Sequence, residues 1–203
     1  MSILIGVLAA GVSAVMALIL GICAATLGKK VDSAISFAID TVMGIPHILL
    51  LILISYAMGK GVKGVIAGVA LTHWTSLARL IRGEVMQLRE SEYIQIAGKL
   101  GLGKWEIAKK HIVPHVLPQF IVGLVLLFPH AILHESSITF LGFGLSTEQP
   151  AIGVILSESM RYLIMGKWWL AVFPGMMLVL TVVLFEKGGT ALRQLLDPGS
   201  VHK

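Results

Sequence analysis

Long apolar segments alternate with short polar ones along this 203-residue chain. A helix rises about 1.5 Å per residue, so about 20 apolar residues cross the hydrocarbon core of a bilayer. Five segments come close to that length, and each predicts a membrane-spanning helix. Their approximate ranges are 4–27, 35–58, 62–80, 116–141 and 168–185. We therefore expect an all-α, polytopic helical bundle in which residues 1–203 form one transmembrane domain.

The composition supports a membrane protein, because hydrophobic residues make up 56% of the chain and charged residues only 13%. Soluble domains carry about 25% charged residues, so too little polar surface is present here to cover a soluble globule. The single cysteine, Cys23, excludes a disulfide within the chain. The net charge of +5 comes mostly from basic residues at the ends of apolar segments. Membrane orientation explains those residues, and we predict no nucleic-acid partner.

Lysine and arginine predict the orientation in the membrane, because cytoplasmic loops are enriched in them. Basic residues collect in the first loop, in segment 82–114 and in the tail, and these three regions would fall on one side of five spans. The opposite side holds four basic residues, namely Lys60, Lys63, Arg161 and Lys167. We therefore predict that the N-terminus of this chain lies outside and the C-terminus in the cytoplasm.

Segment 82–114 is a charged stretch between apolar segments, and its periodicity is helical. Ser91 can cap a helix whose residues Tyr93, Ile96, Ala97 and Leu100 share one face, and Gly101 and Gly103 would end it. A second short helix would begin at Lys104, and Pro114 would mark the return to the membrane. Two short amphipathic helices can lie in a partner protein's groove. They can equally form an interfacial hairpin on lipid headgroups.

Polar residues at membrane depth usually face a cavity or another helix, because they are costly in lipid. His130 and His134 are four residues apart on one helical face, with Glu135 beside them. Histidine nitrogen binds nickel, copper and zinc well, so this pair could touch one metal ion in passing. The same histidines could instead hydrogen-bond neighbouring helices and fix their packing.

Two further features are candidates for a transport pathway. The sequence from Gly44 to His47 contains Pro46 and interrupts the second span, as broken helices do at transport sites. A simple proline kink is the other interpretation, with His47 as a secondary pathway candidate. The segment 146–167 is too polar to cross a membrane, and it could form a short re-entrant or capping helix or a surface loop.

An intramembrane metalloenzyme is a competing class, since it would also place histidines and an acid on one helix. The protease pattern His-Glu-x-x-His fails here, because Ile138 occupies the last position after His134 and Glu135. The chain also lacks a phosphate-binding loop of the Gly-x-x-x-x-Gly-Lys-Ser/Thr type. We therefore predict that the chain is not an enzyme and does not bind a cofactor stably.

Several motifs resemble those of a known family. Ala97, Gly101 and Pro114 have the spacing of the cytoplasmic Glu-Ala-Ala signature in membrane subunits of ATP-binding-cassette importers. Six wider segments resemble the nickel/peptide permease branch of that family. They are 82–94, 97–101, 111–114, 137–144, 173–175 and 191–198. Gln95 and Ile96 depart from the signature, which has Glu and Ala at their positions, although Glu92 supplies the acid usual in this branch.

This resemblance implies the type I importer permease fold and a place in the inner membrane of a prokaryotic cell. The chain would form half of a translocation pathway beside a second, homologous permease subunit, within the membrane lipid. Cytoplasmic ATPase subunits would hold ATP-Mg and bind segment 82–114, and an extracytoplasmic binding protein would deliver cargo. The coupling residues it implies are Glu92, Tyr93, Ala97, Leu100, Gly101, Lys104, Trp105 and Pro114. Members usually begin with one further transmembrane helix, so we expect that a preceding segment is missing here.

The cargo expectation comes from the histidines. The His-x-x-x-His pair and Thr72-His73-Trp74 resemble nickel permeases more than dipeptide permeases. The predicted cargo is nickel or a nickel or transition-metal chelate, and a dipeptide or oligopeptide is the alternative. The pathway candidates are His130, His134, Glu135, His47 and His73, with His130 and His134 as the metal ligands.

Overall fold

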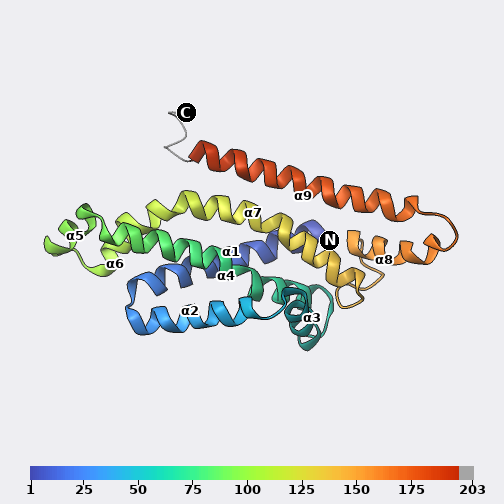
Figure 1. Ribbon diagram of the computed structural model, residues 1–203, viewed down its shortest axis with the longest axis horizontal. Coiled ribbons are helices and arrows are strands. Elements are labelled where there is room, and N and C mark those ends of the chain that lie inside the picture. The colour runs from blue at the N-terminus through green and yellow to red at the C-terminus, as the bar shows by residue number, and fades with distance from the viewer. Residues whose placement is uncertain (197–203) are drawn as a thin grey trace.

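The computed structural model describes residues 1–196, apart from the side chain of Lys104, and this part of the chain contains helices and no strands. The helices, shown in Figure 1, are α1 Ser2–Thr26, α2 Lys29–Gly44, α3 His47–Ala57, α4 Gly61–Glu90, α5 Glu92–Lys99, α6 Lys104–Ile107, α7 Val113–Phe140, α8 Ile152–Leu163 and α9 Trp169–Leu196. The predicted all-α fold class is confirmed.

Four of the described helical stretches are long and apolar enough to cross a membrane. They are α1, α4, α9 and the continuous stretch Trp105–Phe140, in which a π-helical turn at Ala108–Ile112 joins α6 to α7. The pair α2 and α3 would form a fifth crossing only if its two bent halves act as one span.

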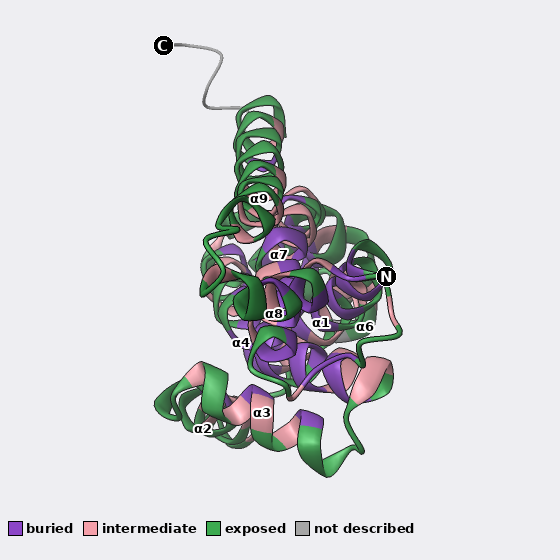
Figure 2. Ribbon diagram, turned by 90° about the vertical axis from the view of Figure 1, so that its right-hand side faces the viewer, coloured by how far each residue is buried: buried purple, intermediate pink, exposed green. Residues whose placement is uncertain are grey.

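The core lies where α1, α4 and α7 meet, and Figure 2 shows buried residues concentrated there. Small residues line α1 where it faces α4, among them Ala14, Ala17 and Gly21. Small side chains let helix backbones approach closely, which is how helices associate in lipid without a hydrophobic driving force. Ser13 adds a hydrogen bond across the seam, because its Oγ donates to the carbonyl of Ala70 at 2.9 Å.

The second predicted span is not one helix, because α2 and α3 meet at an angle of 99°. Proline disfavours helical geometry in the residue before it, and Ile45 is extended at φ −90° and ψ 136°. A simple kink would keep the two halves roughly collinear, so the kink interpretation is wrong. Two ion pairs hold α2 against α4: Arg82 binds both carboxylate oxygens of Asp32, and Arg79 Nη2 lies 2.6 Å from Asp40 Oδ1.

Segment 82–114 lies at one end of the bundle, together with the α1–α2 turn and the C-terminal end of α9 (Figure 1). Its first residues extend α4 as far as Glu90. Arg89 fastens this extension to α1 by donating a hydrogen bond to the carbonyl of Ala25, a favourable place for a cation because the end of a helix carries free carbonyls. The first loop, segment 82–114 and the described end of the tail therefore share one end of the molecule.

The opposite end carries α8, so segment 146–167 contains a short helix rather than a plain loop. That helix lies directly on α7, because a Cβ added to Gly153 would come within 2.7 Å of the carbonyl oxygen of Ser136. The long helix α9 contacts α7 at Gly189, which packs against Leu126, and at Phe185, whose ring centroid lies 4.4 Å from that of Phe128. Most of α9 is exposed, as Figure 2 shows, so a largely apolar helix faces away from this chain.

Candidate functional site

The tip formed by α5 and α6 begins at Ser91, whose Oγ donates to the carbonyl of Leu88 at 2.5 Å instead of capping α5. At the other end of α5, Gly101 adopts φ +92°. Its N–H donates to the carbonyl of Gly98 at 3.1 Å, and the N–H of Leu102 donates to that of Ala97 at 3.2 Å. This pair of bonds is the Schellman ending, in which glycine supplies the left-handed residue. Gly101 therefore sets the direction in which the chain leaves α5.

Two large apolar side chains project from this tip. Leu100 is 78% exposed and Trp105 is 82% exposed, on either side of the Gly101 turn. Tyr93 and Ile96 are also exposed, as is Glu92 in the first turn of α5. Such a cluster of apolar side chains at the charged end of a protein is typical of an interaction surface.

Two predicted coupling residues lie elsewhere. Ala97 is only 7% exposed and packs inward with Ile94, so it does not contribute to the outer surface of the tip. Pro114 lies in the first turn of α7 and lines a cavity of about 580 Å³ together with Glu84, His115 and Arg193. Lys104 begins α6, and its side chain lies outside the described set. The structure thus groups Glu92, Tyr93, Leu100, Gly101 and Trp105, and separates Ala97 and Pro114 from them.

A second candidate site lies near the middle of the bundle, where α3, α4 and α7 each contribute one histidine. The ring centroid of His47 lies 4.7 Å from that of His73 and 4.5 Å from that of His134, and the last two centroids are 4.8 Å apart. One ring nitrogen from each of the three lies within 4.8 Å of the other two. We call these residues the histidine triplet. Its members come from three helices, so the triplet depends on the tertiary fold.

The ring of His73 has a fixed orientation. Its Nδ1 lies 3.0 Å from the carbonyl oxygen of Val69 and 3.0 Å from the hydroxyl of Thr72. A carbonyl can only accept, so Nδ1 carries the proton, and in the neutral imidazole Nε2 then keeps its lone pair. His73 is 9% exposed, and among the described residues Nε2 of His73 and Nε2 of His47 have no hydrogen-bond partner. Two buried imidazole nitrogens are therefore free to bind something else.

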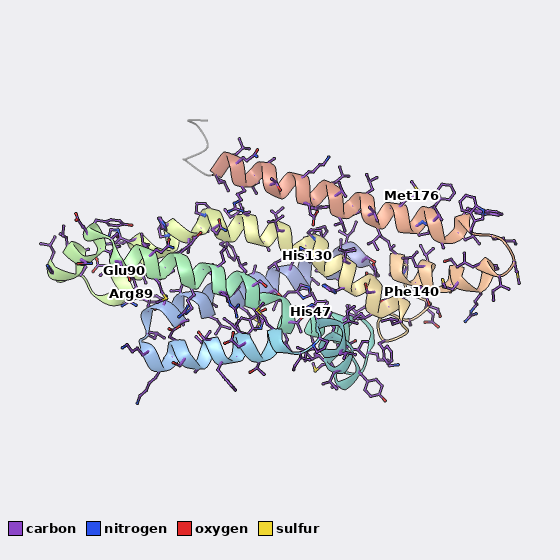
Figure 3. All side chains as sticks on the ribbon, in the orientation of Figure 1. His47, Arg89, Glu90, His130, Phe140 and Met176 are labelled. Atoms are coloured by element: carbon purple, nitrogen blue, oxygen red, sulfur yellow. The ribbon has the colours of Figure 1, made fainter. Side chains whose placement is uncertain are left out.

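The triplet lines a cavity of about 650 Å³, whose wall also includes Met43, Thr75 and Ser76. Cavities of about 300–1,000 Å³ are typical of small-molecule sites. His130 lines the same cavity and is exposed, one turn of α7 from His134. Figure 3 shows His130 on α7 and His47 at the start of α3, both about halfway along the bundle.

The expected partnership of His130, His134 and Glu135 differs from the structure in two ways. His130 is outside the group of ring nitrogens that lie within 4.8 Å of one another. Glu135 is fully buried and accepts hydrogen bonds from Thr139 Oγ1 at 3.0 Å and Ser136 Oγ at 3.3 Å, so it does not line the cavity. Adjacent residues of a helix point about 100° apart, which explains why His134 and Glu135 face different surroundings.

Sequence reasoning named His47 and His73 as candidates but did not place them beside His134. The Gly44–His47 break and the Thr72-His73-Trp74 sequence were the available signals. Their convergence depends on the 99° bend between α2 and α3, and a sequence period does not encode that angle.

Comparisons with known proteins agree with this architecture. A chain from an inward-facing structure of the MetNI methionine ABC transporter superposes with a TM-score of 0.77, over 97% of this chain and 93% of that one, at 16% sequence identity. That likeness shows the fold.

Curated relatives match over most of this chain. The dipeptide transport system permease protein DppC of Bacillus subtilis is 32% identical over 197 residues, which cover 97% of this chain and 62% of that protein. The oligopeptide transport system permease protein OppC of the same organism is 31% identical over 97% of this chain and 64% of its own length. The probable D,D-dipeptide transport system permease protein DdpC of Escherichia coli is 29% identical over 97% of this chain and 66% of its own length. The chain thus spans 62–66% of the length of these relatives.

The family described as binding-protein-dependent transport system inner membrane component matches residues 17–200, which include the last part of α1, all of α4, α7 and α9, the α5–α6 tip and the histidine triplet. This chain therefore belongs to that family of inner membrane transport components.

Proposed function

We propose that this chain is the permease subunit of an ATP-driven importer, in which it forms half of the translocation pathway. The observation that carries this proposal is the exposed apolar pair Leu100 and Trp105 at the α5–α6 tip, in a member of a binding-protein-dependent transport family. A second permease subunit would pack on the exposed apolar helices, α9 among them. Cytoplasmic ATPase subunits would bind the tip, and an external binding protein would deliver cargo at the end that carries α8.

The coupling rests on the geometry of the tip. Rigid-body motions pass between subunits through packed side chains that occupy a groove in a partner. The tip extends directly from α4, and the stretch that begins at Trp105 continues into α7, so a force on it would reach both helices that carry His73 and His134. With the tip in the cytoplasm, the C-terminus also lies there and the N-terminus of this chain lies outside, in the inner membrane of a prokaryotic cell.

The proposed cargo class is a small peptide. Dipeptides and oligopeptides are named for the relatives DppC and OppC. The cavity of about 650 Å³ is large enough for a molecule of dipeptide size. This cargo was the alternative in the sequence interpretation, and the relatives' names favour it over nickel.

Nickel or another transition-metal chelate is the second candidate cargo, and the histidine triplet favours it, because imidazole nitrogen suits these metals. An intramembrane metalloenzyme is disfavoured, since the acid that would serve as its general base, Glu135, faces Ser136 and Thr139 instead of the triplet.

The docking role of the tip is tested by the double variant Leu100→Ala and Trp105→Ala. Burying a large apolar side chain contributes about 1.5–3 kcal/mol, so we expect ATPase affinity to fall by at least about tenfold. Co-purification of the ATPase and ATP-dependent uptake of a labelled dipeptide measure the effect. Membrane insertion should not change, because both side chains are exposed.

The matched control is the double variant Ile164→Ala and Trp168→Ala, which removes a similar exposed pair from the opposite end. It should keep normal ATPase co-purification. If the two double variants retain the ATPase equally well, the tip is not the ATPase-binding surface and the proposed coupling is wrong.

A further inference from the structure

The histidine triplet has the chemistry of a metal site. Three imidazoles without a carboxylate in the group suit nickel, cobalt, copper or zinc, whereas magnesium and calcium require oxygen ligands. We infer that His47, His73 and His134 together coordinate one late first-row divalent metal ion. The ion would arrive in the cavity either alone or held by a small chelator. Its role as cargo rests on the proposed importer function, but its binding does not.

The hydrogen bonds of His73 support this assignment. Metal-binding histidines usually donate their second ring N–H to a backbone carbonyl or a carboxylate, which fixes the ring and the tautomer. His73 has this arrangement through Nδ1 and the carbonyl of Val69, and its buried Nε2 has no hydrogen-bond partner among the described residues. Thr72 strengthens the arrangement, since its hydroxyl lies 2.9 Å from the carbonyl of Gly68 and 3.0 Å from the same Nδ1.

The energetics of burial point the same way. A polar group buried without a hydrogen bond costs about 1–3 kcal/mol. Within the described part of the chain, Nε2 of His47 and Nε2 of His73 are both buried without such a partner. One metal ion that accepts an electron pair from each nitrogen would offset the cost of burying both. A purely structural histidine would be expected to satisfy its second nitrogen through a neighbouring helix.

The spacing fits an ion after a small movement. Nitrogens around a tetrahedral ion with bonds of about 2.0–2.1 Å lie about 3.3 Å apart. The three ring nitrogens here lie within 4.8 Å of one another, so their separations must shorten by up to about 1.5 Å, which takes a movement of about 1 Å by each ring. His47 can supply its share, because it starts α3 directly after the bend at Pro46.

The cavity indicates what else accompanies the ion. One ion fills a small part of about 650 Å³, and three protein ligands leave a coordination position open. Water, a chelating amino acid or a peptide can occupy that position and the remaining space. A peptide-bound metal would also reconcile the triplet with the peptides named for the relatives.

The test is a titration of the purified full chain, without affinity-tag histidines, with Co²⁺ and with Ni²⁺. We expect one bound ion with visible d–d absorption bands. His47→Ala and His134→Ala should each weaken metal binding by at least 10–100-fold, because removing a residue that only hydrogen-bonds to a metal ligand already costs that much. His73 is buried, so His73→Gln is the third variant, since it retains a polar side chain. His115→Ala is the matched control, because His115 lines the separate cavity of about 580 Å³ beside Pro114, and this variant should bind metal normally.

A separate variant distinguishes the triplet from the helical pair. His130→Ala should weaken binding much less than His134→Ala, because His130 is outside the group. Equal losses in these two variants, or normal binding in His47→Ala, would overturn the triplet.

The form of the metal is decided by comparing Ni²⁺ alone with Ni²⁺ and two equivalents of L-histidine. Tighter binding of the second mixture indicates a chelate, and tighter binding of the first indicates the bare ion. ATPase co-purification is measured on the same samples. If the unsubstituted chain co-purifies with the ATPase but binds no metal, the triplet is rejected and the importer proposal stands. If it binds metal but no ATPase co-purifies, the importer proposal is rejected and the triplet stands.

Discussion

The variant Gly21→Leu should separate α1 from α4 and lower the free energy of unfolding by about 3 kcal/mol, at the upper end of the usual cost of overpacking. A Cβ at Gly21 would lie 2.8 Å from the carbonyl oxygen of Ala78 and 3.0 Å from Cβ of Ile81. The carbonyl belongs to the backbone of α4 and cannot rotate away, so the two helices must move apart. Thermal unfolding of the full chain in detergent, followed by tryptophan fluorescence, measures the loss.

Gly11→Leu is the matched control, because Gly11 lies on the same helix and an added Cβ there meets no described neighbouring atom within 4 Å. Leucine favours helix over glycine by roughly 0.5–1 kcal/mol, so this variant should be neutral or slightly more stable. Equal destabilisation by the two variants would mean that the α1–α4 seam is not packed as closely as the structure shows.

The long helices could be predicted because lipid imposes a simple requirement on them. A chain in hydrocarbon must satisfy its backbone hydrogen bonds internally, so about 20 apolar residues in a row specify a helix without reference to the rest of the fold. The segments 4–27 and 116–141 differ from the ends of α1 and α7 by three residues or fewer. The apolar criterion did not predict the polar ends of two helices, because α4 and α9 continue ten or more residues beyond segments 62–80 and 168–185.

The face of α5 could not be assigned in the same way. Its periodicity places Tyr93, Ala97 and Leu100 together, but it does not say which apolar residues pack on their own chain. The structure turns Ile94 and Ala97 inward and leaves Leu100 and Tyr93 outside. A short amphipathic helix between two covering surfaces has two apolar stripes, and only the fold decides which of them remains free.

The histidine triplet shows the same limit at the site. The pair His130 and His134 follows from a helical repeat along one element, whereas the contact of His134 with His47 and His73 requires three elements to converge. Sequence spacing could identify the residue type and the depth in the membrane. It could not give the 99° bend that brings His47 to the other two rings.

The variant Gly101→Leu should weaken ATPase docking by about 5–30-fold, because a left-handed residue with a Cβ costs about 1–2 kcal/mol. Gly101 has φ +92° and no described atom within 4 Å of an added Cβ, so the effect comes from the backbone and not from a clash within the chain. To relieve the strain, the Schellman ending must open, and Leu100 and Trp105 then change their relative positions. ATPase co-purification and the stimulation of ATP hydrolysis by cargo measure the loss.

Two controls separate backbone strain from added bulk. Gly103→Leu places the same side chain two residues away, where the backbone lies outside the left-handed region and no described atom lies within 4 Å of an added Cβ. Gly101→Asn adds a side chain that tolerates the left-handed conformation. Both should retain most of the docking that Gly101→Leu loses. If Gly103→Leu and Gly101→Asn both lose ATPase docking as severely as Gly101→Leu, the added bulk on the surface of the tip is the cause. The direction in which Gly101 turns the chain is then not what the ATPase recognises.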